Sequence, residues 1–261
     1  MIKYVLTAVA VLALVACDQG QDTGKTGAAN KVANKPVAAA NPATTPPKKV
    51  AAKPASKKSP AKDIPYVDPN LAFKGELLYQ QNCVFCHQAD AIGKPGVAPS
   101  LTNQEFLSIA PVDFLYETIR DGRPGTGMPP FKHLGKEGIM AIVAFLRDHA
   151  KLPSRIKEVD SQPRSQGDER RGKLIFEQIC ATCHGPGGNG YAAGGTGTAI
   201  GKKGFLDKVS DGFIRVTIKE GRSFTRMLPF QGPQALADLD DKTIDDIIAY
   251  LRTAPAEKKQ P

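Results

Sequence analysis

The chain has 261 residues, a formal net charge of +9 and no tryptophan. Its length allows one or two domains. Residues 18–64 hold nine lysines and three acidic residues, whereas residues 65–261 hold 25 basic and 23 acidic residues. Because the positive charge does not gather on the part of the chain that is able to fold, the composition argues against a nucleic-acid-binding protein.

Near its start the chain has one basic residue, Lys3, followed by a short apolar segment, "VLTAVAVLALVA" (5–16). This segment is too short for a transmembrane helix, which needs about 20 apolar residues. Its end, "LVAC" (14–17), resembles the lipobox of bacterial lipoproteins, in which the cysteine receives a diacylglycerol and becomes the mature N-terminus. The resemblance implies a signal peptide over residues 1–16 and a lipid anchor on Cys17. An ordinary signal peptide with an unmodified Cys17 is the alternative.

Residues 17–65 are predicted to form a flexible tether behind that anchor. They are rich in alanine, proline and lysine, contain no aromatic residue and show no apolar periodicity, so they bury too little surface to fold. Asp18, next to Cys17, resembles an inner-membrane retention signal of some Gram-negative lipoproteins. This implies the periplasmic side of the bacterial inner membrane, or otherwise the outer face of the cell membrane.

Beyond the tether the sequence contains an internal repeat. "KGELLYQQNCVFCH" (74–87) aligns with "RGKLIFEQICATCH" (171–184), and "DFLYETIRDGRPGTGMPPF" (113–131) aligns with "GFIRVTIKEGRSFTRMLPF" (212–230). The repeat predicts a first domain over residues 66–152, a polar linker over 153–167, a second domain over 168–255 and a disordered tail over 256–261.

Each repeat is predicted to be helical. Apolar residues recur at helical spacing in "GIMAIVAFLRD" (138–148) and "TIDDIIAYLRT" (243–253), and no segment alternates as a strand does. A third short helix in each repeat should end at Gly122 or Gly221. About 85 residues with three short helices form little core on their own, so we expect a large apolar cofactor in each repeat.

The pentapeptides "CVFCH" (83–87) and "CATCH" (180–184) are typical of covalent haem attachment. The two thiols lie on one side of a helical turn, where they can add to two vinyl groups, and the histidine that follows can bind the iron. A zinc site, a thioredoxin-like redox pair and a structural disulfide are weaker alternatives, because each pair has its own histidine, lies outside a βαβ pattern and would close only a short loop. We therefore expect two haem c groups on Cys83, Cys86, Cys180 and Cys183, with His87 and His184 as iron ligands.

Met128 and Met227 are the predicted sixth ligands of the two irons. They occupy equivalent positions in the repeats, in loops that contain proline, whereas Met140 lies on the apolar face of a helix and is expected in the core. His133, five residues after Met128, is an alternative ligand for the first iron.

These motifs together resemble the dihaem class I cytochromes c over residues 66–255. The resemblance implies an all-α fold of two tandem domains, each with three or more short helices around a covalently attached haem. It also implies that a glycine on the first helix of each domain packs against an aromatic residue on the last. Gly75 with Phe145 and Gly172 with Tyr250 match these positions.

The resemblance further implies that the carbonyl of Pro99 accepts a hydrogen bond from the ring of His87. The corresponding segment of the second repeat, residues 192–205, contains no proline, and Arg226 replaces the first repeat's Gly127. Without the carbonyl bond His184 would be a less basic ligand. From both differences we hypothesise that the second haem has the higher reduction potential.

Ligation by histidine and methionine is typical of electron carriers and leaves no position on the iron for a substrate. The sequence therefore predicts a membrane-tethered carrier of single electrons. Its partners would be a membrane complex that oxidises quinol or another substrate, and a terminal oxidase or reductase. The alternative is a haem enzyme, such as a peroxidase, or the electron-accepting subunit of a dehydrogenase that oxidises sulfur compounds. Arg123 and Arg222, which match between the repeats, are predicted to contact haem propionates.

Overall fold

The computed structural model of the chain describes residues 67–253. The predicted signal peptide, the lipidation site Cys17, the tether and the C-terminal tail lie outside these residues. Within them the regular secondary structure is helical, apart from one isolated bridge between Lys94 and Ala98. This confirms the all-α fold. None of the helices in this range is long and apolar enough to cross a membrane.

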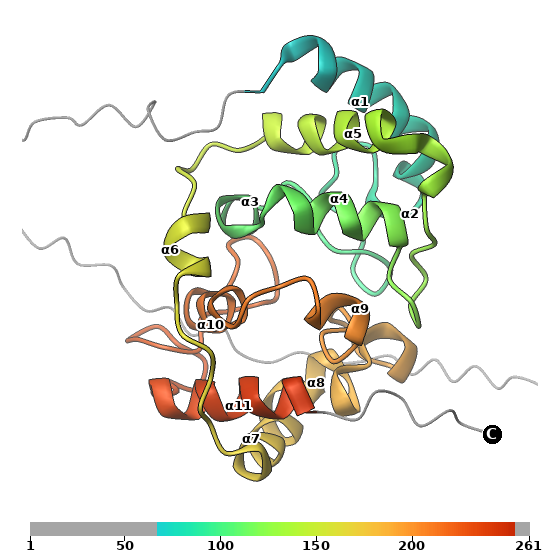
Figure 1. The fold of residues 1–261 in the computed structure, drawn as a ribbon. Helices are drawn as coiled ribbons and strands as arrows, with labels where there is room; N and C mark the ends of the chain where they lie inside the picture. Colours follow the sequence, from blue (N-terminus) through green and yellow to red (C-terminus); the bar gives the residue numbers. More distant parts are fainter. Residues whose placement is uncertain (1–66, 254–261) are drawn as a thin grey trace, which may run out of the picture. The chain divides into compact units, whose positions relative to one another are not determined.

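The helices follow the repeat (Figure 1). The first repeat contains α1 (Pro69–Asn82), α2 (Val84–His87), α3 (Gln104–Ile109), α4 (Val112–Asp121), the 3-10 helix η2 (Lys132–Leu134) and α5 (Gly135–Asp148). The second repeat contains α7 (Glu169–Ile175), the π-helix η3 (Phe176–Cys180), α8 (Ala181–His184), the 3-10 helices η4 (Pro186–Gly188) and η5 (Gly190–Ala193), α9 (Lys203–Leu206), α10 (Asp211–Glu220) and α11 (Asp241–Thr253).

Local sequence determines where these helices begin and end. The side chain of Asp68 caps α1 by accepting the N–H of Asn70 at 2.9 Å, and Asp168 caps α7 in the same way. Helices α4 and α10 end at Gly122 and Gly221, both with φ of 66°. Glycine adopts this left-handed conformation without strain, which explains why the expected helix ends are correct.

Two glycines allow the first and last helices of each repeat to approach closely. A Cβ atom on Gly75 would overlap the carbonyl oxygen of Ala141 and press on Cβ of Phe145. A Cβ atom on Gly172 would overlap the carbonyl oxygen of Asp246, one turn before Tyr250. The contacts α1–α5 and α7–α11 therefore require glycine at these positions, as the family resemblance implied.

Buried aromatic pairs hold the same helices together. The ring centroids of Tyr79 and Phe145 lie 5.1 Å apart, and those of Phe176 and Tyr250 lie 5.3 Å apart. Tyr79 and Phe176 are fully buried and occupy equivalent positions in the two repeats. Each pair packs beside the segment that carries a Cys-x-x-Cys-His pentapeptide, so it holds that segment against the last helix.

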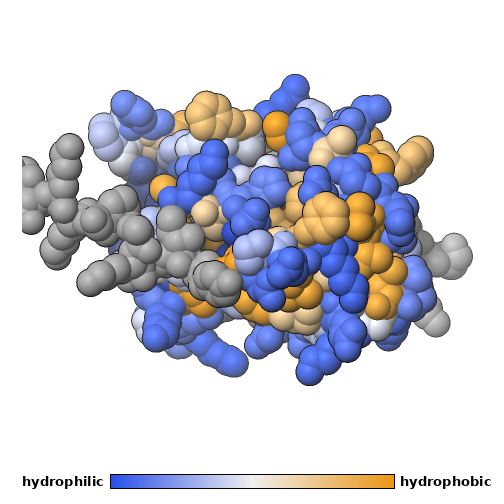
Figure 2. Space-filling view, turned by 90° about the horizontal axis from the view of Figure 1, so that it is seen from above, coloured by the Kyte–Doolittle hydropathy of each residue, from blue (hydrophilic) through white to orange (hydrophobic). Residues whose placement is uncertain are grey.

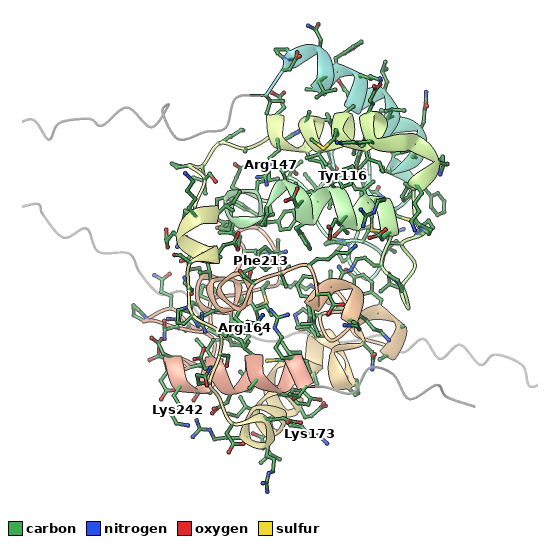
Figure 3. All side chains as sticks on the ribbon, in the orientation of Figure 1. Tyr116, Arg147, Arg164, Lys173, Phe213 and Lys242 are labelled. Carbon is green, nitrogen blue, oxygen red and sulfur yellow. The ribbon has the colours of Figure 1, made fainter. Side chains whose placement is uncertain are left out.

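An arginine at the end of the last helix of each repeat bonds to another element. Arg147 on α5, labelled in Figure 3, is buried and donates to the carbonyl oxygens of Leu107 and Ala110 at the end of α3. Its counterpart Arg252 on α11 is exposed and donates to the carboxylate of Asp211 at 2.6 Å. The carbonyl groups left free at the end of a helix or turn are thus satisfied by side chains from another element.

The segment between the repeats is more than a polar linker. It contains a short helix, α6 (Ile156–Asp160), which sequence analysis did not predict, and Val159 on this helix is fully buried. Arg155 just before α6 pairs with Glu158 and, at 2.7 Å, with Glu220 of the second repeat. Helix α6 therefore packs between the two repeats and contributes to a common core.

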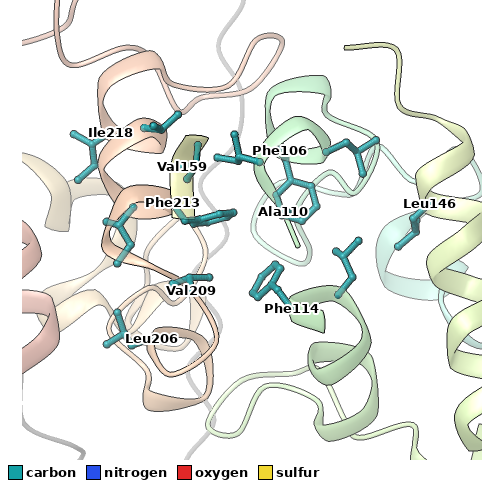
Figure 4. Close-up of a cluster of buried hydrophobic side chains, with 14 of the residues drawn as sticks. Phe106, Ala110, Phe114, Leu146, Val159, Leu206, Val209, Phe213 and Ile218 are labelled. Atoms are coloured by element: carbon teal, nitrogen blue, oxygen red, sulfur yellow. The ribbon is translucent and has the colours of Figure 1, made fainter. Parts of the chain in front are cut away.

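Aromatic side chains from both repeats meet in that core (Figure 4). The ring of Phe114 lies 5.6 Å from that of Phe213 and 6.2 Å from that of Phe205. Phe106 packs on Phe114 from within the first repeat, at 6.2 Å. We call this contact between residues 103–123 and 198–225 the seam. The two repeats form one compact unit, and the predicted domain boundaries stay predictions.

Candidate functional site

One cavity of about 1810 Å³ is lined by both pentapeptides and by loops of both repeats. Pockets for a single small ligand have volumes of roughly 300–1,000 Å³, so this cavity is large enough for more than one such group. The predicted attachment and ligand residues all line it: Cys83, Cys86, His87, Met128, Cys180, Cys183, His184 and Met227. The structure thus gathers around one space residues that are up to 144 positions apart in the chain.

The first pentapeptide lies at the junction of α1 and α2. Cys83 ends α1, and its backbone N–H donates to the carbonyl of Tyr79 at 2.8 Å. Burial, with a smaller contribution from Cys86, raises the pKa of the Cys83 thiol to about 11. A thiol held neutral in an apolar wall is compatible with conversion to an uncharged thioether, the linkage that joins haem c to the chain.

The second pentapeptide follows a π-helical turn, η3, which ends at Cys180 and leads directly into α8. Such turns are rare and are frequent at functional sites. Burial raises the pKa of the Cys180 thiol to about 12, with Cys183 and Glu177 adding to the shift. The two repeats thus carry equivalent pairs of cysteine thiols, but the first pair follows an α-helix and the second begins at the last residue of a π-helix.

Both pentapeptide histidines use Nδ1 for a backbone hydrogen bond. Nδ1 of His87 lies 3.0 Å from the carbonyl oxygen of Pro99, and Nδ1 of His184 lies 2.8 Å from that of Thr198. Burial lowers the pKa of both rings, against the effect of these hydrogen bonds. A neutral ring that donates from Nδ1 keeps Nε2 as a free lone pair for a metal, and the carbonyl fixes the ring orientation.

The hydrogen bond of His184 contradicts one premise of the hypothesis on reduction potentials. Sequence analysis found no proline in the corresponding segment of the second repeat and left the partner of His184 open, and the carbonyl of Thr198 takes the place of that of Pro99. Thr198 lies 14 residues after the histidine and Pro99 lies 12 residues after it, because the Gly-rich loop is longer. Arg226, the second premise, is exposed. The backbone carbonyl of any residue can accept a hydrogen bond, so the residue type at position 198 gave no sign that it would orient His184.

The two methionines are held by loops of the same design. In each loop an arginine N–H donates to the methionine carbonyl, and the methionine N–H donates to a threonine hydroxyl. That hydroxyl in turn donates to the arginine carbonyl, at 2.7 Å in the first repeat and 2.8 Å in the second. The residues are Arg123, Thr126 and Met128 in the first loop, and Arg222, Thr225 and Met227 in the second. The matching loops place both thioethers on the cavity wall.

His133 is poorly placed to replace Met128. It lies on the exposed turn η2 and does not line the cavity, and its ring packs at 6.0 Å from that of Phe131. Met140 also does not line the cavity and is half-buried on α5. Of these three residues, only Met128 lines the cavity.

The wall of the cavity fits a haem. Much of it is apolar, and six of its large apolar side chains are exposed: Phe85, Ile92, Val97, Leu152, Phe224 and Leu236. Figure 2 shows such apolar side chains lying among polar ones on one face of the molecule. Four cationic residues also line the wall, Lys94, Arg123, Arg222 and Arg226, and Nε of Arg222 is buried with no hydrogen-bond partner. A flat apolar group that carries carboxylates, as haem does, would pack against the apolar side chains and pair with the cationic ones.

The alternatives to haem find no support in the described part of the chain. All four pentapeptide cysteines are free, and no group of three or more His, Cys, Asp and Glu side chains within residues 67–253 is placed to hold a metal ion. No parallel sheet accompanies the Cys-x-x-Cys pairs there.

Comparison with known families decides the assignment. The family model described as "Cytochrome C oxidase, cbb3-type, subunit III" matches residues 70–146 and again 167–251. The chain belongs to this family. As a member of the cbb3-type subunit III family with both segments matched, it is a dihaem class I cytochrome c with two covalently bound haem c groups and a function in electron transfer.

Individual relatives agree with the family. The chain is 35% identical over 129 residues to the cbb3-type cytochrome c oxidase subunit CcoP of Rubrivivax gelatinosus, which covers 49% of this chain and 39% of the relative. It is 26% identical over 192 residues to CcoP of Azospirillum sp. (strain B510), covering 68% of this chain and 60% of the relative. It is 28% identical over 199 residues to the cytochrome bc1 complex cytochrome c subunit of Mycobacterium bovis, covering 72% and 64%. The chain thus matches less than two thirds of the length of each relative.

Proposed function

We propose that this chain is a membrane-anchored shuttle that carries single electrons through two haem c groups. In the proposal Cys83 and Cys86 hold the first haem, with His87 and Met128 as its axial ligands. The corresponding residues of the second haem are Cys180, Cys183, His184 and Met227.

The observation that carries the proposal is the matched geometry of the two sites. In each repeat the histidine ring is oriented by a backbone carbonyl and the methionine is held by a closed loop, and both line one cavity. When bound, haem supplies a one-electron Fe(III)/Fe(II) couple, and ligation by histidine and methionine raises its potential. The histidine and the methionine of each repeat would both bind the haem iron and would leave no position for a substrate, which supports electron transfer over chemistry on a substrate.

The partners that we propose are membrane redox complexes on both sides of the shuttle. The named relatives are subunits of a terminal oxidase and of a bc1 complex. Electrons would enter from a complex that oxidises quinol or another substrate and leave to an oxidase or reductase. The anchor would be a lipid on Cys17, which would hold the chain at the periplasmic side of the inner membrane.

The test of this proposal uses the full chain produced in a host that attaches haem c. We expect a mass with two added haems, a Met–iron charge-transfer band with the intensity of two haems in the oxidised spectrum, and little reaction of either ferrous iron with carbon monoxide. Ready binding of carbon monoxide at both irons would contradict the carrier and favour an enzyme.

The anchor is tested separately with the Cys17→Ala variant. We expect the wild-type chain to fractionate with membranes and the variant to leave them, with the two haems unchanged in both. Retention of Cys17→Ala in the membrane fraction to the wild-type extent would contradict a lipid anchor at this residue.

A further inference from the structure

Two equivalent arginines cross the seam in opposite directions. Nη2 of Arg123, from the first repeat, donates to the carbonyl oxygen of Ala199 in the second repeat at 2.5 Å, and its guanidinium lies 5.1 Å from the ring centre of Phe205. Arg222, from the second repeat, lies 4.9 Å from the ring centre of Phe106 in the first. Both line the common cavity, so each repeat contributes a cationic side chain to the wall that the two sites share.

The hydrogen bond from Arg123 ends one residue away from the carbonyl group that orients His184, the proposed histidine ligand of the second iron. Ala199 follows Thr198, whose carbonyl accepts the hydrogen bond from Nδ1 of His184. The guanidinium therefore holds the backbone segment that orients this ring. Arg222 occupies the equivalent position but differs in its bonding, because its Nε is buried without a hydrogen-bond partner. The arrangement is thus asymmetric, with a side chain of the first repeat supporting the ligand of the second.

The positive charge at the seam also lies unequally between the two repeats. The guanidinium of Arg123 bonds to Ala199 and faces the ring of Phe205, both in the second repeat. The guanidinium of Arg222 lies between the rings of Phe106 in the first repeat and Phe213 in the second, at 4.9 and 6.0 Å. Both guanidinium groups therefore contact elements of the second repeat. A nearby cation disfavours Fe(III) relative to Fe(II), and it does so more strongly in a desolvated site.

We propose that the first repeat tunes the second haem across the seam. Arg123 acts as a positioning residue for His184 through Thr198 and Ala199, and together with Arg222 it raises the midpoint potential of the second haem above that of the first. In the forward step one electron leaves the first site, which is oxidised from Fe(II) to Fe(III). It enters the second site, which is reduced from Fe(III) to Fe(II), and no bond is formed or broken. This inference rests on the ligands proposed above.

The test is a potentiometric titration of the full chain with both haems attached. The component whose spectrum and midpoint survive in Met128→Leu is assigned to the second haem. In the wild type we expect it to have the higher midpoint. The Arg123→Gln variant should change the Fe(III)/Fe(II) ratio of the second haem at least threefold towards Fe(III) at a fixed potential, about 30 mV for a one-electron couple, and should change the first haem less.

Two further variants separate charge and position from a general loss of structure. Arg120→Gln removes the same charge three residues earlier, from a side chain paired with Asp121 on α4, and should move neither midpoint. Arg123→Lys keeps the charge without the planar fork of donors, so it should lower the second midpoint less than Arg123→Gln does. If Arg123→Gln does not retain the second haem, the comparison is made with Arg222→Gln, for which the same direction is expected.

Several outcomes would overturn the inference. They are a lower midpoint for the second haem in the wild type, equal shifts of both haems in Arg123→Gln, or equal losses in Arg123→Gln and Arg123→Lys. A Met–iron band with the intensity of two haems in the wild type checks the ligand assignment independently. A failure of the seam inference is therefore distinguishable from a failure of the proposed function.

Discussion

Nδ1 of His184 lies 2.8 Å from the carbonyl oxygen of Thr198, in a loop that a side chain from the other repeat holds in place. In the first repeat the corresponding bond of His87 to Pro99 stays within one repeat. Two sites with the same ligands are thus supported by different neighbours. This difference, more than the ligand set itself, is the physical basis on which the two haems would differ.

The methionine ligands can be tested against a methionine that does not line the cavity. We expect Met128→Leu and Met227→Leu each to halve the Met–iron band and to shift the Fe(III)/Fe(II) ratio of one haem at least tenfold towards Fe(III), about 59 mV. Met140→Leu conserves volume on α5 and should leave the band and both midpoints unchanged. A wild-type spectrum in Met128→Leu would return His133 as a candidate ligand.

The close approach of the first and last helices predicts a strong effect of a single methyl group. Gly75→Ala and Gly172→Ala would force a Cβ onto the backbone of α5 or α11, so we expect each to lower the free energy of unfolding by more than about 2 kcal/mol. Urea denaturation of the haem-bound protein measures this. Gly127 has open space around it, and Gly127→Ala should change stability by less than about 0.5 kcal/mol. Equal effects at the three positions would contradict the packing argument.

The aromatic core at the seam predicts that the two repeats unfold together. Phe213 is 1% exposed and contacts Phe114 and Phe205 from both sides of the seam. Phe213→Ala should cost about 3–5 kcal/mol and split the unfolding transition in two, because each repeat then loses the support of the other. Phe73→Ala removes a side chain that is 64% exposed on α1 and serves as the matched control. Two separate transitions in the wild type would contradict a shared core.

A carboxylate at the seam predicts a pH dependence of stability. Glu105 accepts the hydroxyl of Ser223 at 2.6 Å and its N–H at 3.2 Å. Burial raises the pKa of Glu105, but hydrogen bonds from Ser223, its own N–H and Asn103 outweigh burial, so the pKa lies below the ordinary 4.5. The stabilisation is therefore present above pH 4.5 and is lost as the pH falls through the lower folded-state pKa.

The Glu105→Gln variant isolates this contribution. At neutral pH we expect it to be less stable than the wild type by about 1 kcal/mol, a value reduced for partial exposure to solvent. The difference should shrink as the pH is lowered below 4.5. Glu76→Gln, at an exposed position on α1, should show neither effect. A difference from the wild type that stays constant down to pH 3 would show that the seam bond does not depend on the charge.

The sequence alone determined the fold class, the two cofactors and the residues predicted to hold them. These features depend on short local patterns, namely the Cys-x-x-Cys-His turns, the helical periodicity and the glycines that end helices, and such patterns are legible without knowing what lies nearby. The tertiary structure decided the rest. It showed that the carbonyl of Thr198 orients His184 and that α6 packs between the repeats. It also showed that His133 does not line the cavity and that Arg123 bonds to the second repeat. Backbone carbonyls carry no residue signature, and contacts between residues 76 positions apart depend on how whole helices pack, so neither could be inferred from the order of the residues.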